Sequence, residues 1–190
     1  MSALTRTTRT TRAALVAAAA LPALALAAAP ASAAEAGGGG GTDHVRSCTN
    51  DDIKPIENRR GAAAGTLAVE FGITKIQNGK GPCLMPGWIE VRWVDGFEGE
   101  QVGSWARQRE APGEPFVLTM RNTGKFTLFH PNPDNCDPEQ CRPTEVAGIE
   151  YFLPGDTTGN FGGMGDNMYA CANPEVRGTS LSAVTLDYDG

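Results

Sequence analysis

The sequence predicts an all-β fold, and three observations lead to this prediction. Apolar and polar residues alternate with a period of two in several short segments, which is the pattern of strands with one face on a core. The 24 Gly and 13 Pro fall largely between these segments, and no stretch of about a dozen residues shows helical periodicity. Together they favour an immunoglobulin-like, two-sheet antiparallel β-sandwich of about seven to nine strands, held by disulfides.

The clearest strand is "GTLAVEFGIT" (65–74), whose alternating apolar residues are expected to be buried: Leu67, Val69, Phe71 and Ile73. A second strand carries Ile89, Val91 and Trp93, turns at Asp95-Gly96 and returns through "QVGSWA" (101–106). One helical turn is expected at "TNDD", capped by Thr49. Further strands are expected in "PFVLTMRN" (115–122, with Met120 facing inward), "FTLFH" (126–130), "GIEYFLP" (148–154) and "SLSAVTLDY" (180–188).

The first 34 residues have the pattern of a signal peptide. A basic segment with Arg6, Arg9 and Arg12 precedes the apolar run 13–29, and small residues follow at an Ala-x-Ala site. The run is shorter than the roughly 20 residues of a spanning helix, so cleavage near Ala33 or Ala34 is favoured over a membrane anchor. Residues 35–47 contain five successive glycines and are predicted to be a disordered linker, followed by one β-sandwich domain over 48–190.

Charge argues against nucleic acid as a partner. Without the three arginines of the signal peptide, 13 basic residues face 22 acidic ones. A strongly acidic domain repels the phosphate backbone of nucleic acids. In addition, no segment after the signal peptide is apolar enough to span a membrane. We therefore expect a secreted, extracellular protein whose partner is an unidentified protein or cell-wall ligand.

Five cysteines lie in the predicted domain, and export favours disulfides among them. "CDPEQC" (136–141) has no second Cys pair and no nearby His cluster, so it is not expected to bind zinc. One thiol must remain unpaired because five is odd. The spacing alone does not decide which four cysteines pair, or how.

Four segments in order resemble an exported actinobacterial family, the domain-of-unknown-function family 4232: "CTNDDIKP", "FGITKIQNGKGPCLMPGWIEVRWVDGFEGEQVG", "CRPTEVAGIEYFLPG" and "ACANPEVRGTSLSAVTL". The positions that match are Cys48, Asn78, Cys83, Gly87, Asp95, Cys141, Pro143, Pro154 and Cys171. The turn "CLMPGW" differs from the usual sequence of the family at this turn, and Cys136 is not part of the family's pattern. The resemblance implies a secreted or envelope-tethered β-sandwich with two disulfides, and it implies no activity.

With the family order taken into account, we predict disulfides Cys48–Cys83 and Cys141–Cys171 and a free thiol at Cys136. Since Cys136 and Cys141 are five residues apart, a Cys136–Cys171 or Cys136–Cys141 bond stays open as an alternative. Asp134 and Asp137 flank Cys136 and disfavour its thiolate, so slow reaction is expected.

No catalytic residues, metal ligands or cofactor-binding residues are predicted. The chain has only His44 and His130 and no Gly-x-Ser-x-Gly motif, so a serine hydrolase is not indicated, and His130 is expected at the surface. The glutamates of 98–114 lie in Gly- and Pro-rich turns, where nothing holds two of them at the spacing of a glycosidase pair. The sequence therefore favours a protein that is not an enzyme.

The segment Thr158–Tyr169 is glycine-rich and is predicted to be a flexible loop. Its apolar residues make it a candidate recognition loop: Phe161, Met164, Met168 and Tyr169. The leading hypothesis is a non-enzymatic extracellular or cell-envelope module of unknown ligand. The alternative is a secreted inhibitor or accessory subunit of an exported enzyme, which needs the same rigid scaffold and an exposed loop.

Overall fold

The computed structural model describes residues 45–176 and 178–187, and this part of the chain is mostly β. Strands hold 51% of it and helices 7%, which agrees with the predicted absence of long helices. The helices are η1 (Asn50–Asp52), η2 (Pro133–Asn135) and α1 (Pro138–Cys141), and none in the described ranges is long and apolar enough to cross a membrane. The predicted signal peptide (1–34) and residues 35–44 of the predicted linker lie outside the described residues.

The largest sheet is built around the predicted strand 65–74. Its order is β1 (Ile53–Ala63), β2 (Thr66–Lys75), β8 (Thr123–Pro131), β11 (Ser180–Leu181) and β6 (Arg107–Gln108), and β12 (Thr185–Asp187) also pairs with β8. All of its pairings are antiparallel except β11 with β6.

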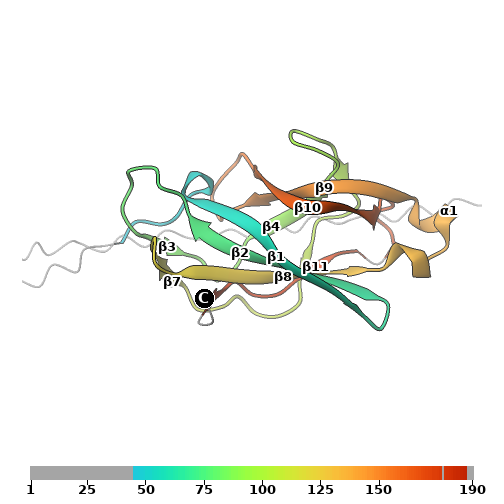
Figure 1. Cartoon of the computed structure of the whole chain (residues 1–190), viewed down its shortest axis with the longest axis horizontal. Helices are drawn as coiled ribbons and strands as arrows, with labels where there is room; N and C mark the ends of the chain where they lie inside the picture. Colours follow the sequence, from blue (N-terminus) through green and yellow to red (C-terminus); the bar gives the residue numbers. More distant parts are fainter. Residues whose placement is uncertain (1–44, 177, 188–190) are drawn as a thin grey trace, which may run out of the picture. The chain divides into compact units, whose positions relative to one another are not determined.

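A second sheet has the order β10 (Asn160–Cys171), β9 (Pro143–Phe152), β4 (Glu90–Val94) and β5 (Gln101–Val102), and every neighbouring pair is antiparallel. β5 is the predicted return of the hairpin after Asp95-Gly96, shortened to two residues. A small third sheet pairs β3 (Cys83–Met85) with β7 (Phe116–Leu118). Figure 1 shows the two larger sheets as two layers.

One buried cluster takes side chains from both larger sheets and so joins them. Phe71 of β2 stacks on Phe126 of β8, with ring centroids 5.2 Å apart. β4 and β9 contribute their inward-facing residues: Val91, Trp93, Ile149 and Tyr151. Each such side chain stabilises the fold by about 1.5–3 kcal/mol through burial, so this shared core determines which face of each sheet remains in solvent.

The turn "PGW" after Cys83 requires a glycine. The Gly87 carbonyl accepts hydrogen bonds from the Gly113 and Val184 N–H groups, both at 2.9 Å. A Cβ at Gly87 would lie 1.7 Å from the Gly113 oxygen, so no larger residue fits. The chain then enters β4 with Glu90 and Arg92 on the solvent side and Val91 and Trp93 on the core side.

Two local predictions are wrong. Met120 was expected to face inward, but β7 ends at Leu118 and Met120 is 63% exposed in a turn. Asn122 makes that turn by accepting the Thr119 N–H at 2.7 Å. Arg46 and Ser47 were expected in the linker, but the Leu84 N–H donates to the Arg46 carbonyl at 2.8 Å and Ser47 pairs with Leu84.

Candidate functional site

The disulfides join Cys48 to Cys83 and Cys141 to Cys171, the two predicted pairs, and Cys136 is free and half-buried. The Cα atoms are 4.9 Å apart in the first bridge and 4.7 Å in the second. The first bridge fastens the segment before η1 to β3, and the second fastens α1 to the end of β10. Each closes a loop of 30 to 35 residues and so stabilises the fold by roughly 3–4 kcal/mol in the chain-entropy account.

The predicted recognition loop is a strand. Thr158–Tyr169 mostly belongs to β10, which pairs with β9 and carries an irregularity between Gly163 and Met168. Met168 is buried, and Met164 is partly buried and packs against the core, so both side chains serve the core. Phe161 lies half-exposed on the outer face of the sheet, and Tyr169 is 55% exposed.

A groove of about 450 Å³ opens on this outer face, and we call it the aromatic groove. The strand register places Arg92 of β4 directly opposite Glu150 of β9, and these two residues lie among those that line it. Val94 of β4, the β4–β5 loop and the segment 158–161, which runs into β10, supply the remainder. The side chains of its lining include Arg92, Val94, Phe97, Glu98, Glu150, Asn160 and Phe161.

Arg92 is held in place on several sides. Its guanidinium forms an ion pair with the Glu150 carboxylate and donates from Nη1 to the Gln101 side-chain oxygen at 3.2 Å. It also lies 5.0 Å from the Trp105 ring centroid and 5.7 Å from that of Phe152. A cation fixed between a carboxylate and two rings presents its remaining N–H groups in one orientation, which favours ligand binding without reorganisation.

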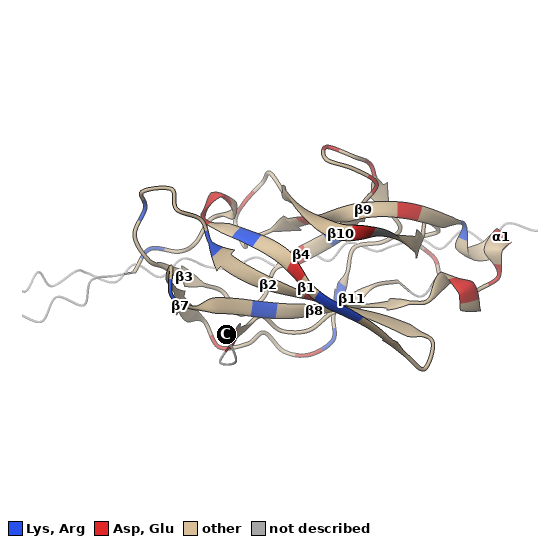
Figure 2. Cartoon of the chain, viewed as in Figure 1, with Lys and Arg blue, Asp and Glu red and all other residues tan. Residues whose placement is uncertain are grey.

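Aromatic side chains flank this charged pair. Phe97, in the β4–β5 loop, is 75% exposed and meets Phe161 edge to face at 5.8 Å. Phe161 covers Gly148 of β9, where a Cβ would lie 2.6 Å from the Phe161 ring. Glycine at 148 therefore lets the Phe161 ring lie against the sheet. The β4–β5 loop also carries Asp95, Glu98 and Glu100, so acidic residues border this face (Figure 2).

A second hollow of about 390 Å³ is lined by Trp88, Trp105 and Gln108, together with Ile89, Glu90 and Ala106. Trp105, which is 40% exposed, stacks on Arg92 of the aromatic groove and also lines this second hollow. The two hollows are therefore linked through the Arg92–Trp105 contact and provide a track of aromatic and polar groups longer than either of them.

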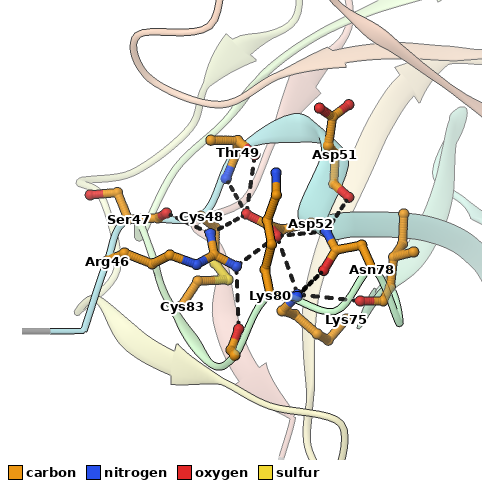
Figure 3. A network of polar contacts seen from close by, with 12 residues as sticks. Arg46, Ser47, Cys48, Thr49, Asp51, Asp52, Lys75, Asn78, Lys80 and Cys83 are labelled. Atoms are coloured by element: carbon orange, nitrogen blue, oxygen red, sulfur yellow. Dashed lines mark hydrogen bonds and ion pairs between the residues drawn. A yellow bond between two sulfur atoms is a disulfide. The ribbon is translucent and has the colours of Figure 1, made fainter.

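A polar network around Asp52 lies beside the first disulfide (Figure 3). Asp52 is fully buried and accepts hydrogen bonds from Arg46 Nη2 at 2.8 Å, Asn78 Nδ2 at 2.9 Å and Lys75 Nζ at 3.2 Å. The Arg46 guanidinium, followed by Asn78, Thr49 and Lys75, holds the pKa of this carboxyl far below its usual range, against the opposing effect of burial. Because its acceptors are occupied by the protein itself, the network anchors the chain and offers no binding site.

His130 is buried, so its predicted surface position is wrong. Its side chain shares the inward face of β8 with Phe126 and Leu128, and Thr179 Oγ1 lies 2.9 Å from its Nδ1. The Trp93 indole N–H donates to the same oxygen at 2.6 Å, so the Thr179 hydroxyl joins the two rings. The other ring nitrogen, Nε2, is buried and has no hydrogen-bond partner among the described residues.

Burial lowers the pKa of His130 to about 4. Between pH 6.5 and 4 the unfolded chain binds a proton that the folded protein does not, so the free energy of unfolding is expected to fall with decreasing pH. Between pH 7 and pH 4.5, His130 should lower the free energy of unfolding by about 2–3 kcal/mol. Urea unfolding of the wild type and of His130→Gln at both pH values measures it. An equal loss in the variant would contradict this assignment.

The sequence did not indicate the aromatic groove, because β9, β4 and their connections are distant in sequence and only the strand register brings Arg92 to Glu150. Comparison of the chain with family models, with curated proteins and with solved structures finds no match. The interpretation of the site therefore rests on its own geometry.

Proposed function

We propose that this protein is an exported, non-enzymatic binding module that holds a carbohydrate polymer of the cell envelope in the aromatic groove. The observation that carries the proposal is the pairing of exposed aromatic rings, Phe97 and Trp105, with the fixed Arg92–Glu150 ion pair on one solvent-facing sheet. Export agrees with the two disulfides and with the predicted signal peptide.

Sugar rings suit this surface for two reasons. Their C–H faces are apolar and stack on flat aromatic side chains, while their hydroxyls both donate and accept hydrogen bonds. The groove offers donors on Arg92 and Asn160 and acceptors on Glu150 and Asn160. Its lining carries one cation, Arg92, and two carboxylates, Glu98 and Glu150, so it favours a neutral ligand over a phosphate polymer.

The length of the track favours a polymer over a single sugar. Arg92 lines the aromatic groove of about 450 Å³ and contacts Trp105, which lines the second hollow of about 390 Å³, so the two hollows lie next to each other. Both hollows are shallow and open to solvent, which suits successive units of a chain lying across β9, β4 and β5.

We further propose that the two sheets form an immunoglobulin-like sandwich of the kind implied by family 4232. Two facts support this: antiparallel sheets share one core, and a tryptophan of β4, Trp93, lies fully buried within it. Such a scaffold fixes the outer face of the β10-β9-β4-β5 sheet, and with it the position of the groove.

Phe97→Ala should lower the affinity for envelope polysaccharide by about tenfold or more, because truncation of an exposed aromatic anchor removes the stacking surface. Since Phe97 is 75% exposed, stability should change by less than about 0.5 kcal/mol. Sedimentation of the purified protein with an insoluble cell-wall fraction and with its isolated polysaccharide measures the bound fraction.

Tyr169→Ala is the matched control, since Tyr169 is an exposed aromatic residue of the same sheet that does not line the groove. It should bind as the wild type does. Loss of binding in Tyr169→Ala with full binding in Phe97→Ala would move the site to the end of β10. Retention by a protein and by no polysaccharide would overturn the proposal and favour the inhibitor or accessory-subunit alternative.

A further inference from the structure

Three sulfur atoms gather at the end of the molecule formed by η2, α1 and the end of β10. The Sγ atoms of Cys136, Cys141 and Cys171 all lie within 4.8 Å of one another, although only the last two are bonded. Cys141 is fully buried and Cys171 is 5% exposed, whereas Cys136 is half-buried. A half-buried free thiol therefore lies within 4.8 Å of both sulfurs of a disulfide that solvent scarcely reaches.

Local structure holds Cys136 in this position. Asn132 caps η2 by accepting the Asp134 N–H at 3.1 Å, and the Cys136 N–H closes that turn on the Pro133 carbonyl at 3.0 Å. The Cys136 thiol lies 3.9 Å from the Asn132 carbonyl, the distance of a weak S–H donor bond. Its placement beside the disulfide thus follows from two adjoining hydrogen-bonded turns.

We propose that these three cysteines form a thiol–disulfide exchange site, with Cys136 as the entry point for external low-molecular-weight thiols. In the first step the Cys136 thiolate attacks Cys171 Sγ, a Cys136–Cys171 bond forms, and Cys141 leaves as a thiolate that takes up a proton. This step consumes no oxidant or reductant, because one disulfide and one thiol give one disulfide and one thiol.

The second step uses the exposure of Cys136. An external thiolate attacks Cys136 Sγ and forms a mixed disulfide, and Cys171 leaves as a thiol. A second external thiol then attacks the external sulfur, restores the Cys136 thiol and departs as an oxidised external disulfide. The net change is two external thiols oxidised and the Cys141–Cys171 bond reduced, through a sulfur that solvent can reach.

Attack on Cys171 is favoured over attack on Cys141 by chain topology. A Cys136–Cys171 bond closes a loop of about the same length as the 30-residue separation of the native pair, so the two isomers restrict the unfolded chain almost equally. A Cys136–Cys141 bond would join neighbouring turns and release the end of β10. Exchange at Cys171 keeps β10 fastened throughout the first step.

The Cys48–Cys83 disulfide provides an internal control. Cys48 is 6% exposed and Cys83 is 0% exposed, close to the values for Cys171 and Cys141. The three remaining cysteines, including the free Cys136, lie together in the other cluster. External thiols should therefore reduce it only through local opening.

The test is the rate at which dithiothreitol reduces each disulfide of the full folded protein, followed by acid quenching, alkylation and peptide mapping. In the wild type, Cys141–Cys171 should be reduced about tenfold or more faster than Cys48–Cys83. In Cys136→Ser this advantage should disappear, while the Cys48–Cys83 rate stays unchanged. Early time points of the wild type should contain a Cys136–Cys171 peptide with Cys141 alkylated.

Equal rates for the two disulfides in the wild type, or an advantage that persists in Cys136→Ser, would overturn the proposal. Thermal unfolding of Cys136→Ser confirms that the variant is folded. Cys141→Ser gives a second readout: exchange chemistry predicts a Cys136–Cys171 bond and no titratable thiol under denaturing conditions, whereas two thiols would contradict it. Cys48→Ser, with Cys83 and Cys136 both left free, is the matched control.

Discussion

Asp52→Ala is expected to lower the free energy of unfolding by about 3–5 kcal/mol, the cost of removing one partner from a buried ion pair. Lys75 would keep a buried ammonium with no carboxylate beside it, since its Nζ now lies 3.2 Å from the Asp52 oxygen. Arg46 and Asn78 would lose the acceptor that fastens the start of the folded part to β2. Urea unfolding at pH 7, followed by circular dichroism, measures the change.

Asp51→Ala is the matched control because Asp51 is exposed and adjacent, and its effect should stay within about 0.5 kcal/mol. The dependence of the free energy of unfolding on pH below about 4 gives a second check. The pKa of Asp52 is lowered in the folded state, so its contribution is fully present above the unfolded pKa near 4 and declines as pH falls below it. Asp52→Asn should lack that decline. Equal stability of Asp52→Ala and wild type would contradict the anchoring role.

Trp93→Ala is expected to cost about 3–5 kcal/mol, because the largest fully buried side chain would leave a cavity between the sheets. The indole also donates to Thr179 Oγ1 at 2.6 Å, and that hydroxyl in turn contacts His130. The variant therefore loses packing and one end of a buried hydrogen-bond chain. Chemical denaturation at pH 7 determines the cost.

Trp93→Phe separates the two contributions, because it keeps an aromatic ring and removes the N–H. Its cost should be about 1–3 kcal/mol, because the Thr179 hydroxyl loses its donor and the phenyl ring is smaller than the indole. Trp105→Ala, a tryptophan outside the core, should change stability by less than about 1 kcal/mol. A Trp105→Ala cost that equals the Trp93→Ala cost would contradict the assignment of Trp93 to the shared core.

The predicted strands were right where strict alternation marked a face. In β2, Val69, Phe71 and Ile73 are all fully buried, as their spacing of two requires, whereas Leu67, which was also expected to be buried, is partly buried. The same rule would have placed His130 correctly, because it continues the series Phe126, Leu128 on the buried face of β8. For this residue its position in the alternation is a stronger signal than the usual surface preference of histidine.

Other parts of the fold left no such signal. β1 is an edge strand that is exposed along most of its length, so "ENRRGAA" shows no apolar period. β10 contains Gly162, Gly163 and Gly165, which give no apolar alternation, and its irregularity shifts the register before Met168. The aromatic groove depends on strand pairing between distant segments, which the residue pattern of one segment does not reveal.

The most direct test of the central proposal, that the aromatic groove holds an envelope polysaccharide, is titration of the ¹⁵N-labelled protein with oligosaccharides released from that polymer, followed by amide and indole chemical shifts. The proposal predicts saturable shifts at the Trp105 indole and at the amides of Phe97, Glu150 and Phe161, with no change at Met120 in the distant β7–β8 turn. The absence of shifts at the groove, or shifts confined to residues outside it, would contradict the proposal.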